Sequence, residues 1–145
     1  MKKISLLLFF TLLFSLSTIS QTRQYLNLTM DYSRFKVDNE NSYVEFYYAY
    51  SPFELNKKNI DGKKYTELLL KFTIIDTITK EVILDKMWNL RNEFIDSVSE
   101  KYAISLSRFL LEYAPYRVKV LAMDINNTSK FDSVSFPLEI QKFTN

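Results

Sequence analysis

Apolar and polar side chains alternate with a period of two along most of the chain, which is typical of β-strands with one buried face. Seven stretches carry this pattern. Their expected core-facing residues are Leu26, Leu28, Met30 and Tyr32; Val44, Phe46, Tyr48 and Tyr50; Thr66, Leu68, Leu70, Phe72 and Ile74; Val82, Leu84, Trp88 and Leu90; Tyr102, Ile104 and Leu106; Tyr116, Val118, Val120 and Ala122; and Val134, Phe136, Leu138 and Ile140. Seven short strands predict an all-β fold, an immunoglobulin-like sandwich of two antiparallel sheets.

Three places interrupt the alternation. Phe35 and Val37 follow Tyr32 in the opposite phase, which predicts a bulge or bend near residues 33–34. Lys86 occupies an apolar position of the fourth stretch. Residues 92–101 are the least regular segment and fit one amphipathic turn of helix, so we expect little helix overall.

Turn residues separate the stretches where the sandwich requires it. Asp-Asn-Glu-Asn at 38–41 follows the first stretch, and Asp61-Gly62 is a strong tight-turn pair before the third. Residues 76–79 precede the fourth stretch, and residues 126–129 join the last two. These connections agree with consecutive antiparallel strands.

The segment SYVEFYYAYSPF, residues 42–53, places five aromatic residues among the eight positions 43–50. Three of them share the phase of the expected core. Tyr43 and Tyr47 lie with Glu45 on the opposite face, where a central strand is normally more polar. We therefore take Tyr43, Glu45 and Tyr47 as a candidate contact surface, which an outward Ile83 or Met87 would extend into one apolar patch.

Residues 110–118, LLEYAPYRV, contain a proline-bearing corner formed by Pro115 and Tyr116. In immunoglobulin-like sandwiches a tyrosine near the start of the penultimate strand donates a hydrogen bond back across such a corner. Tyr116 is the candidate for this role, and an ordinary core tyrosine is the alternative.

The first 20 residues have the three parts of a secretory signal: Lys2 and Lys3, a short apolar run, and small residues at Thr18 and Ser20. We expect cleavage after Ser20 and one domain over residues 21–145. A membrane anchor is the rival interpretation, but the run is shorter than the roughly 20 apolar residues of a spanning helix. Export would place the protein in the periplasm, at the cell surface or outside a Gram-negative cell.

Composition excludes several classes of activity. The chain has no His and no Cys, which removes the usual catalytic triads, thiol chemistry and ordinary zinc sites. Gly62 is the only glycine, so a P-loop or a dinucleotide fingerprint cannot form. Without Lys2 and Lys3 the chain carries 17 basic and 17 acidic residues, which argues against nucleic acid as a partner. We expect no cofactor and no metal.

Carboxylates leave two other possibilities open. Asp31 and Glu45 on neighbouring strands have the residue types of a glycoside-cleaving pair, but both are expected to be solvated. Loop oxygens at residues 38–41 and at Asp124, Asn126 and Asn127 suit calcium, although neither group has EF-hand spacing.

Three tripeptides, beginning at Asp76, Asp96 and Asp132, resemble an O-glycosylation acceptor that some Gram-negative bacteria use on exported proteins. The acceptor residues would be Thr77, Ser97 and Ser133. Turn chemistry and strand alternation are the alternative explanations.

Residues 31–35 (DYSRF) and 42–48 (SYVEFYY) resemble the opening of a bacterial envelope family named for its GWxTD motif. Trp88 and the corner at residues 111–116 lie where that family has a similar tryptophan and corner. The resemblance covers about residues 30–125 and implies the N-terminal sandwich module of the family, because the chain has no Gly-Trp pair. It supports the fold and the envelope location rather than an activity.

Together these features predict an exported, non-catalytic immunoglobulin-like module that binds an envelope protein or a glycan. A structural subunit that packs its outward face on itself or on a separately encoded domain is the alternative. A carboxylate-based hydrolase is the remote third possibility.

Overall fold

The computed structural model describes residues 25–95 and 102–143, and strands make up most of them. The elements are β1 (Thr29–Lys36), β2 (Asn41–Tyr50), the short 3-10 helix η1 (Pro52–Glu54), β3 (Lys57–Ile60), β4 (Lys63–Asp76), β5 (Val82–Glu93), β6 (Ala103–Glu112), β7 (Pro115–Asp124) and β8 (Phe131–Glu139). Residues 1–24, which include the predicted leader, lie outside the described part. None of the helices described is long and apolar enough to span a membrane.

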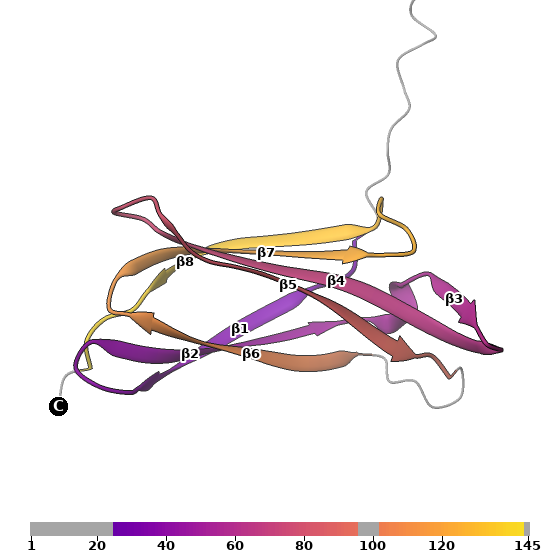
Figure 1. Cartoon of the computed structure of the whole chain (residues 1–145), viewed down its shortest axis with the longest axis horizontal. Helices are drawn as coiled ribbons and strands as arrows, with labels where there is room; N and C mark the ends of the chain where they lie inside the picture. The colour runs from indigo at the N-terminus through magenta and orange to yellow at the C-terminus, as the bar shows by residue number, and fades with distance from the viewer. Residues whose placement is uncertain (1–24, 96–101, 144–145) are drawn as a thin grey trace, which may run out of the picture.

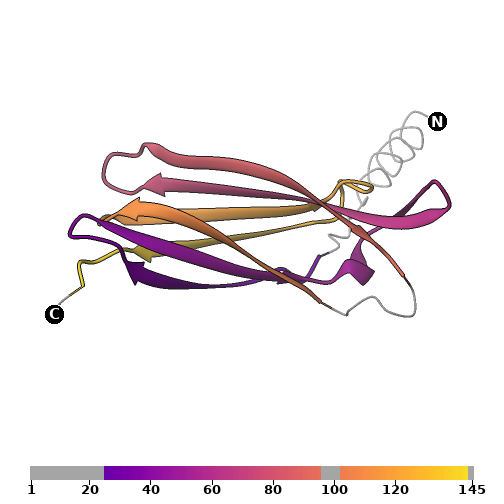
Figure 2. The ribbon, with the colours of Figure 1, turned by 60° about the horizontal axis from the view of Figure 1, so that its bottom comes forward.

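The strands form two antiparallel sheets that face each other (Figures 1 and 2). One sheet has the order β1-β2-β6. In the other, β4 pairs with β5 along one edge and with β7 and the short β3 along the other, and β8 follows β7. With β3 set aside, β1-β2-β6 corresponds to strands A, B and E of an immunoglobulin domain. In the other sheet, β4-β7-β8 corresponds to the neighbouring strands C, F and G. The immunoglobulin-like sandwich predicted from the alternation is confirmed.

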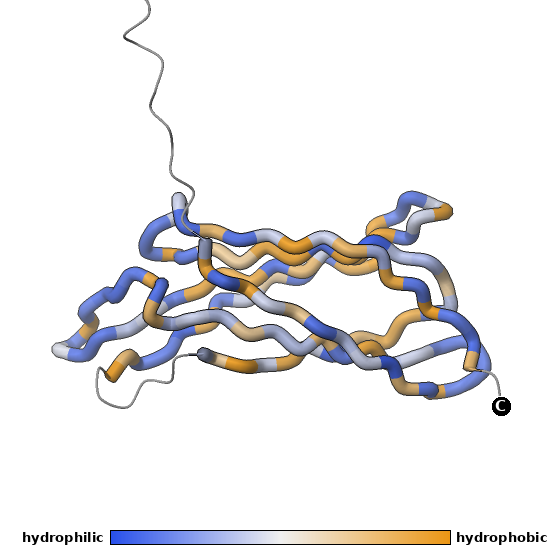
Figure 3. Tube along the Cα trace, turned by 180° about the vertical axis from the view of Figure 1, so that it is seen from behind, coloured by the Kyte–Doolittle hydropathy of each residue, from blue (hydrophilic) through white to orange (hydrophobic). Residues whose placement is uncertain are grey.

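The core lies between the sheets and is rich in aromatic rings. Phe72 of β4 is central, with its ring centroid 5.5 Å from that of Phe46, 5.9 Å from Trp88 and 5.7 Å from Phe109. These contacts join both sheets, since Phe46 and Phe109 belong to the three-stranded one. Figure 3 shows hydrophobic and hydrophilic residues alternating along the strands that enclose this core. The core-facing residues expected for β2, β4 and β7 are all buried.

The first stretch differs from its prediction. β1 pairs with β2 in one continuous register, from Thr29 opposite Ala49 to Lys36 opposite Ser42, so the bulge expected at residues 33–34 is absent. Phe35 and Val37 are instead exposed, because they occupy the phase that points away from the core. A register shift does occur between Ile74 and Ile75 of β4, where that strand pairs with β5.

The face assigned to the fifth stretch is wrong by one residue. Ala103, Phe109 and Leu111 of β6 pack toward the core, whereas Ile104 and Leu106 are exposed. Tyr102 is also exposed. Both phases of β6 carry apolar side chains, so the alternation does not identify its buried face.

The hairpin before β4 follows its turn chemistry. Asp61 and Gly62 both have positive φ, 50° and 79°, as a two-residue type I′ turn requires. The strand on its other side, β3, is an eighth strand that the pattern does not predict. At the irregular segment, β5 continues to Glu93, and residues 96–101 lie outside the described part.

The chain crosses between the sheets at residues 113–114, from β6 to β7. The Tyr116 hydroxyl donates a hydrogen bond of 3.1 Å to the backbone carbonyl of Glu112, four residues upstream. Pro115 starts β7 on the far side of the crossing. The Tyr113 hydroxyl donates to the Asp38 carbonyl at 2.9 Å, which ties the crossing to the β1–β2 turn.

Candidate functional site

The outward face of the β1-β2-β6 sheet brings together the residues that the sequence singles out on β2. Cross-strand pairing orders this face in four rows: Phe35, Tyr43 and Leu110; Ser33, Glu45 and Arg108; Asp31, Tyr47 and Leu106; and Thr29, Ala49 and Ile104. We call these twelve residues the outer face. Its middle column comes from β2, so Tyr43, Glu45 and Tyr47 lie at its centre.

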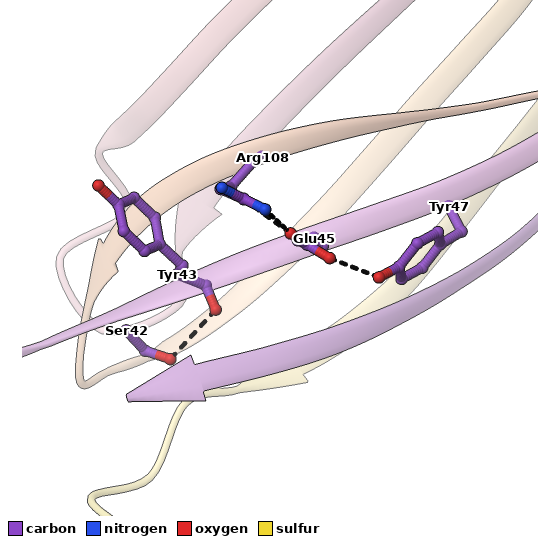
Figure 4. Close-up of polar contacts among 5 residues, drawn as sticks. All are labelled: Ser42, Tyr43, Glu45, Tyr47 and Arg108. Carbon is purple, nitrogen blue, oxygen red and sulfur yellow. Dashed lines mark hydrogen bonds and ion pairs between the residues drawn. The ribbon is translucent and has the colours of Figure 1, made fainter. Parts of the chain in front are cut away.

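Glu45 is the polar centre of the outer face, and it is only 6% exposed. Arg108, from the neighbouring strand, donates to its Oε1 through Nε at 2.7 Å and through a terminal nitrogen as well. The Tyr47 hydroxyl donates to the other carboxylate oxygen, Oε2 (Figure 4). The expected solvated carboxylate is therefore covered, because side chains from two strands close over it.

These contacts fix the charge state of the site. The hydrogen bond from the Tyr47 hydroxyl, and next that from Arg108, lower the pKa of the Glu45 carboxyl. The same Tyr47 hydrogen bond raises the pKa of the Tyr47 hydroxyl. Glu45 thus stays ionised and Tyr47 stays protonated around neutral pH, so neither is suited to exchange protons with a substrate.

Tyr43 lies on the other side of the arginine. The Arg108 guanidinium carbon is 5.7 Å from the Tyr43 ring centroid, within the range of a cation–π contact (Figure 4). Tyr43 nevertheless remains 40% exposed. Arg108 is therefore held between a carboxylate and an aromatic ring in a defined orientation, with more than half of its side chain open to solvent.

Apolar residues flank this polar centre at both ends of the sheet. Phe35 and Leu110 are exposed beside Tyr43, while Leu106 and Ile104 are exposed toward the other end. Ile104, 77% exposed, borders a shallow hollow of about 190 Å³ that also includes Tyr47 and the small side chain of Ala49. The result is an apolar surface with a fixed tyrosine–arginine–glutamate cluster in its middle.

Part of the predicted patch lies elsewhere. Ile83 and Met87 are exposed, but they belong to β5 in the other sheet and therefore do not share a sheet face with Tyr43 and Tyr47. Arg108 was not predicted, since nothing local links it to Glu45, 63 residues away. The apolar contributions of β6 were missed because the wrong face was assigned to that strand.

A buried glutamate paired with an arginine is not in itself a sign of function here. On the outward face of the other sheet, Glu67 of β4 is also buried, and Arg91 of β5 binds its Oε1 through two nitrogens at 2.6 Å each. The outer face differs from this second pair in that the Tyr47 hydroxyl donates to its carboxylate and the Tyr43 ring lies against its arginine.

The loop carboxylates serve as acceptors within their own turns. The Asp38 carboxylate accepts the backbone N–H groups of Glu40 and Asn41, at 2.8 and 2.7 Å. The fully buried Asp124 accepts those of Asn56 and Asn126, at 2.7 and 2.9 Å. The acidic residues in both loops are therefore explained by the hydrogen bonds that hold the backbone of each loop.

The remaining sequence candidates make local contacts of their own. Asp31 lies one row from Glu45 on the outer face, where it pairs with Tyr47, and its carboxylate accepts the N–H of Tyr32. The Thr77 hydroxyl donates to the Pro115 carbonyl at 3.0 Å. Ser133 is exposed on β8, and Ser97 lies outside the described residues.

Comparisons with known proteins bear on the fold. No protein-family model matches the chain, and no curated protein sequence matches it. Among solved structures, it is similar to part of β-glucuronidase 2 of Bacteroides uniformis, with a TM-score of 0.54, 12% identity and 81% of this chain covered. It is also similar to part of a glycosyl hydrolase family 2 member of Bacteroides cellulosilyticus, with a TM-score of 0.51, 8% identity and 77% of this chain covered.

In both comparisons the chain spans only 14% of the length of the matched protein. A putative β-galactosidase of Bacteroides fragilis gives a similar result, with a TM-score of 0.51, 12% identity, 77% of this chain and 16% of that chain covered. At these identities the similarity concerns the fold, an antiparallel β-sandwich that also occurs as a segment of larger glycosidases.

Proposed function

We propose that this chain is an exported, non-catalytic binding module of the bacterial envelope, which recognises a partner protein through the outer face. The observation that carries the proposal is the composition of that face. Exposed apolar side chains surround Tyr43, Tyr47 and Arg108, and tyrosine and arginine are enriched among the residues that dominate binding energy at protein interfaces.

The geometry supports binding more than catalysis. Arg108 is already oriented by Glu45 and by the Tyr43 ring, so a partner would meet a preformed polar group and little side-chain ordering would be needed. The Glu45 carboxylate has both oxygens occupied, which leaves it unsuited to act as a nucleophile. The leader-like first 20 residues and the resemblance to an envelope family support the proposed location.

A pull-down from an envelope extract tests the proposal. The double variant Tyr43→Ser, Tyr47→Ser should lose partners that the unchanged protein retains, whereas Tyr65→Ser on the outward face of the other sheet should retain them. Thermal unfolding of each variant shows whether the fold persists. The same captured proteins on all three baits would contradict the proposal.

Two other outcomes have distinct meanings. A purified protein that forms dimers or larger oligomers by light scattering, and loses them in the same double variant, would support the assembly-subunit alternative. Binding to a glycan array that the double variant abolishes would identify a carbohydrate as the ligand in place of a protein.

A further inference from the structure

The strand arrangement leaves one side of β6 without a neighbour among the described strands. When β1, β2, β4, β6, β7 and β8 are matched to strands A, B, C, E, F and G, β5 lies beside C. Variable-type immunoglobulin domains have a strand in that position and also a strand D beside E. Here β5 pairs along β4 from Val82 to Glu93, and no described strand occupies the position beside β6.

Sheet edges are normally protected against pairing with another strand, by inward-pointing charges, prolines, bulges or very short strands. The other free edges in the described part all have one of these protective features. β1 has Arg34 and Lys36 in the core-facing phase, β5 has Lys86 in that phase, β8 has Pro137, and β3 is only four residues long with two lysines.

β6 differs from every one of these edges. Its core-facing positions are Ala103, Ser105, Ser107, Phe109 and Leu111. The strand has no proline or glycine, and its pairing with β2 is continuous over all ten residues. Its charged residues, Arg108 and Glu112, both lie in the outward phase, where they do not obstruct a further strand.

A hollow lies beside the unprotected edge. Its volume is about 500 Å³, and it is lined by Leu110 and Glu112 of β6, by Ile83 of β5 and by Asp76 and Glu81 at the β4–β5 turn. Its lining residues come from this turn and from the β6–β7 crossing, which lie at the same end of the molecule (Figure 2). Both sheets contribute to it, so it provides room next to the C-terminal half of β6.

The hollow is acidic. Three carboxylates line it, and none of its described lining residues is basic, although Lys80 lies in the same turn with its Nζ directed to the Thr77 carbonyl. Burial first, and then the charges of Asp76 and Glu112, raise the pKa of the Tyr116 hydroxyl, which also lines the hollow. In antiparallel pairing a second copy of β6 would place its uncharged first residues, Ala103 and Ile104, beside Glu112. A segment with basic residues at its N-terminal end would instead complement the charge of the hollow.

We propose that β6 accepts an extended segment of a partner protein as an added antiparallel strand, with basic residues at the segment's N-terminal end. Antiparallel pairing places that end beside Glu112, in the acidic hollow, and main-chain hydrogen bonds would provide most of the affinity. Alternate side chains of the segment would extend the outer face next to Ile104, Leu106 and Leu110.

Strand addition rests on the proposed binding function, but the contact that it adds is made by the edge of β6 rather than by the outer face. The probe is a synthetic peptide that begins with two lysines, continues with alternating valine and threonine, and carries a fluorophore at its C-terminal end. Its binding to the purified protein is followed by fluorescence anisotropy, and Tyr43 and Tyr47 remain unchanged. A failure of strand addition at the β6 edge can therefore be distinguished from a failure of partner binding at the outer face.

Main-chain pairing is tested without altering the protein. Two versions of the peptide are N-methylated on alternate residues, one on the even and one on the odd positions. Because only every second N–H of an added strand points at β6, one version should lose about tenfold or more in affinity and the other should bind nearly as well as the parent. Equal binding by both versions, or equal loss by both, would overturn strand addition.

Protein variants test the edge and the hollow. Ser105→Lys gives β6 an inward charge like that of Lys86 and should weaken peptide binding by about tenfold or more. Ser135→Lys, the same change on β8, should not. Glu112→Gln should weaken the lysine-bearing peptide more than one with alanines in place of the lysines. Absence of peptide binding, together with self-association that Ser105→Lys abolishes, would overturn the proposal in favour of a second copy as the occupant.

Discussion

At the scale of single residues, Glu45 shows how a charged group can be held on the outside of a sheet. Its position on β2 points away from the core, yet Arg108 and Tyr47 close over it and satisfy both carboxylate oxygens. A covered carboxylate is stable only when it is paired and hydrogen-bonded, and this cluster meets both conditions. In the folded protein the Glu45 carboxylate consequently stays ionised to a lower pH than it would in the unfolded chain.

The pH dependence of the cluster follows from the lowered pKa of Glu45. Because the folded-state pKa lies below the unfolded value of about 4.3, the stabilisation is fully present above that pH and is lost as the pH falls through the folded-state pKa. Tyr47→Phe removes the largest cause of the shift. We therefore expect the Glu45 pKa to rise toward its ordinary value, measured by NMR titration of the side-chain carboxyl carbon.

Tyr43→Phe is the matched control for this measurement, since Tyr43 contacts Arg108 through its ring rather than Glu45 through its hydroxyl. The Glu45 pKa should stay where it is in that variant. An unchanged Glu45 pKa in Tyr47→Phe would show that the tyrosine hydroxyl does not hold the carboxylate in solution.

At the scale of elements, the position of β5 at the edge of its sheet explains why a lysine interrupts its apolar alternation. Lys86 occupies a core-facing position in β5, opposite Phe72, where the alternation calls for an apolar residue. β5 is an edge strand, so the lysine can extend past the edge to solvent while it obstructs pairing by another strand. The exception in the pattern is thus explained by the position of the strand in the sheet.

Replacing this lysine should expose the edge of β5. We expect Lys86→Val to increase concentration-dependent self-association relative to the unchanged protein, measured by analytical ultracentrifugation. Lys119→Val removes the same charge from an exposed position on β7, which has neighbours on both sides, and should leave association unchanged. Equal behaviour of the two variants would mean that net charge, rather than the edge, controls association.

At the scale of the whole molecule, one aromatic cluster holds the two sheets together. Phe72 of the five-stranded sheet lies against Phe46 and Phe109 of the other, with Trp88 at the side of the cluster. The chain has no cysteine, so disulfides make no contribution to its stability. The packing between the sheets therefore carries most of the stability of the described domain.

Phe72→Ala should destabilise the protein by about 3–5 kcal/mol, the usual cost of removing a buried phenylalanine. The single tryptophan, Trp88, reports on the same cluster, so urea unfolding followed by its fluorescence measures the loss. Phe35→Ala, on the exposed outer face, should change the free energy of unfolding by less than about 0.5 kcal/mol. Similar losses in both variants would contradict the assignment of the core.

How much of this was predictable from the sequence varies from strand to strand. The buried faces of β2, β4 and β7 were predicted correctly because each has large apolar residues mainly in one phase. β6 was assigned the wrong face because Ile104 and Leu106 are larger than Ala103 and Ser105, which actually point inward. Size and hydrophobicity identify the core face when most of the large apolar residues lie on it, as in β2, and they mislead when the larger residues lie outward, as in β6.

The sequence by itself determined the sandwich, its main turns and the location of Tyr43 and Tyr47 on an outward face, since these depend on local alternation and turn residues. Tertiary structure decided that Arg108 meets Glu45, that β5 lies beside β4, and that β2 is the only described strand that pairs with β6. These features depend on which strands become neighbours, and residues far apart in the chain carry no local signal of that choice.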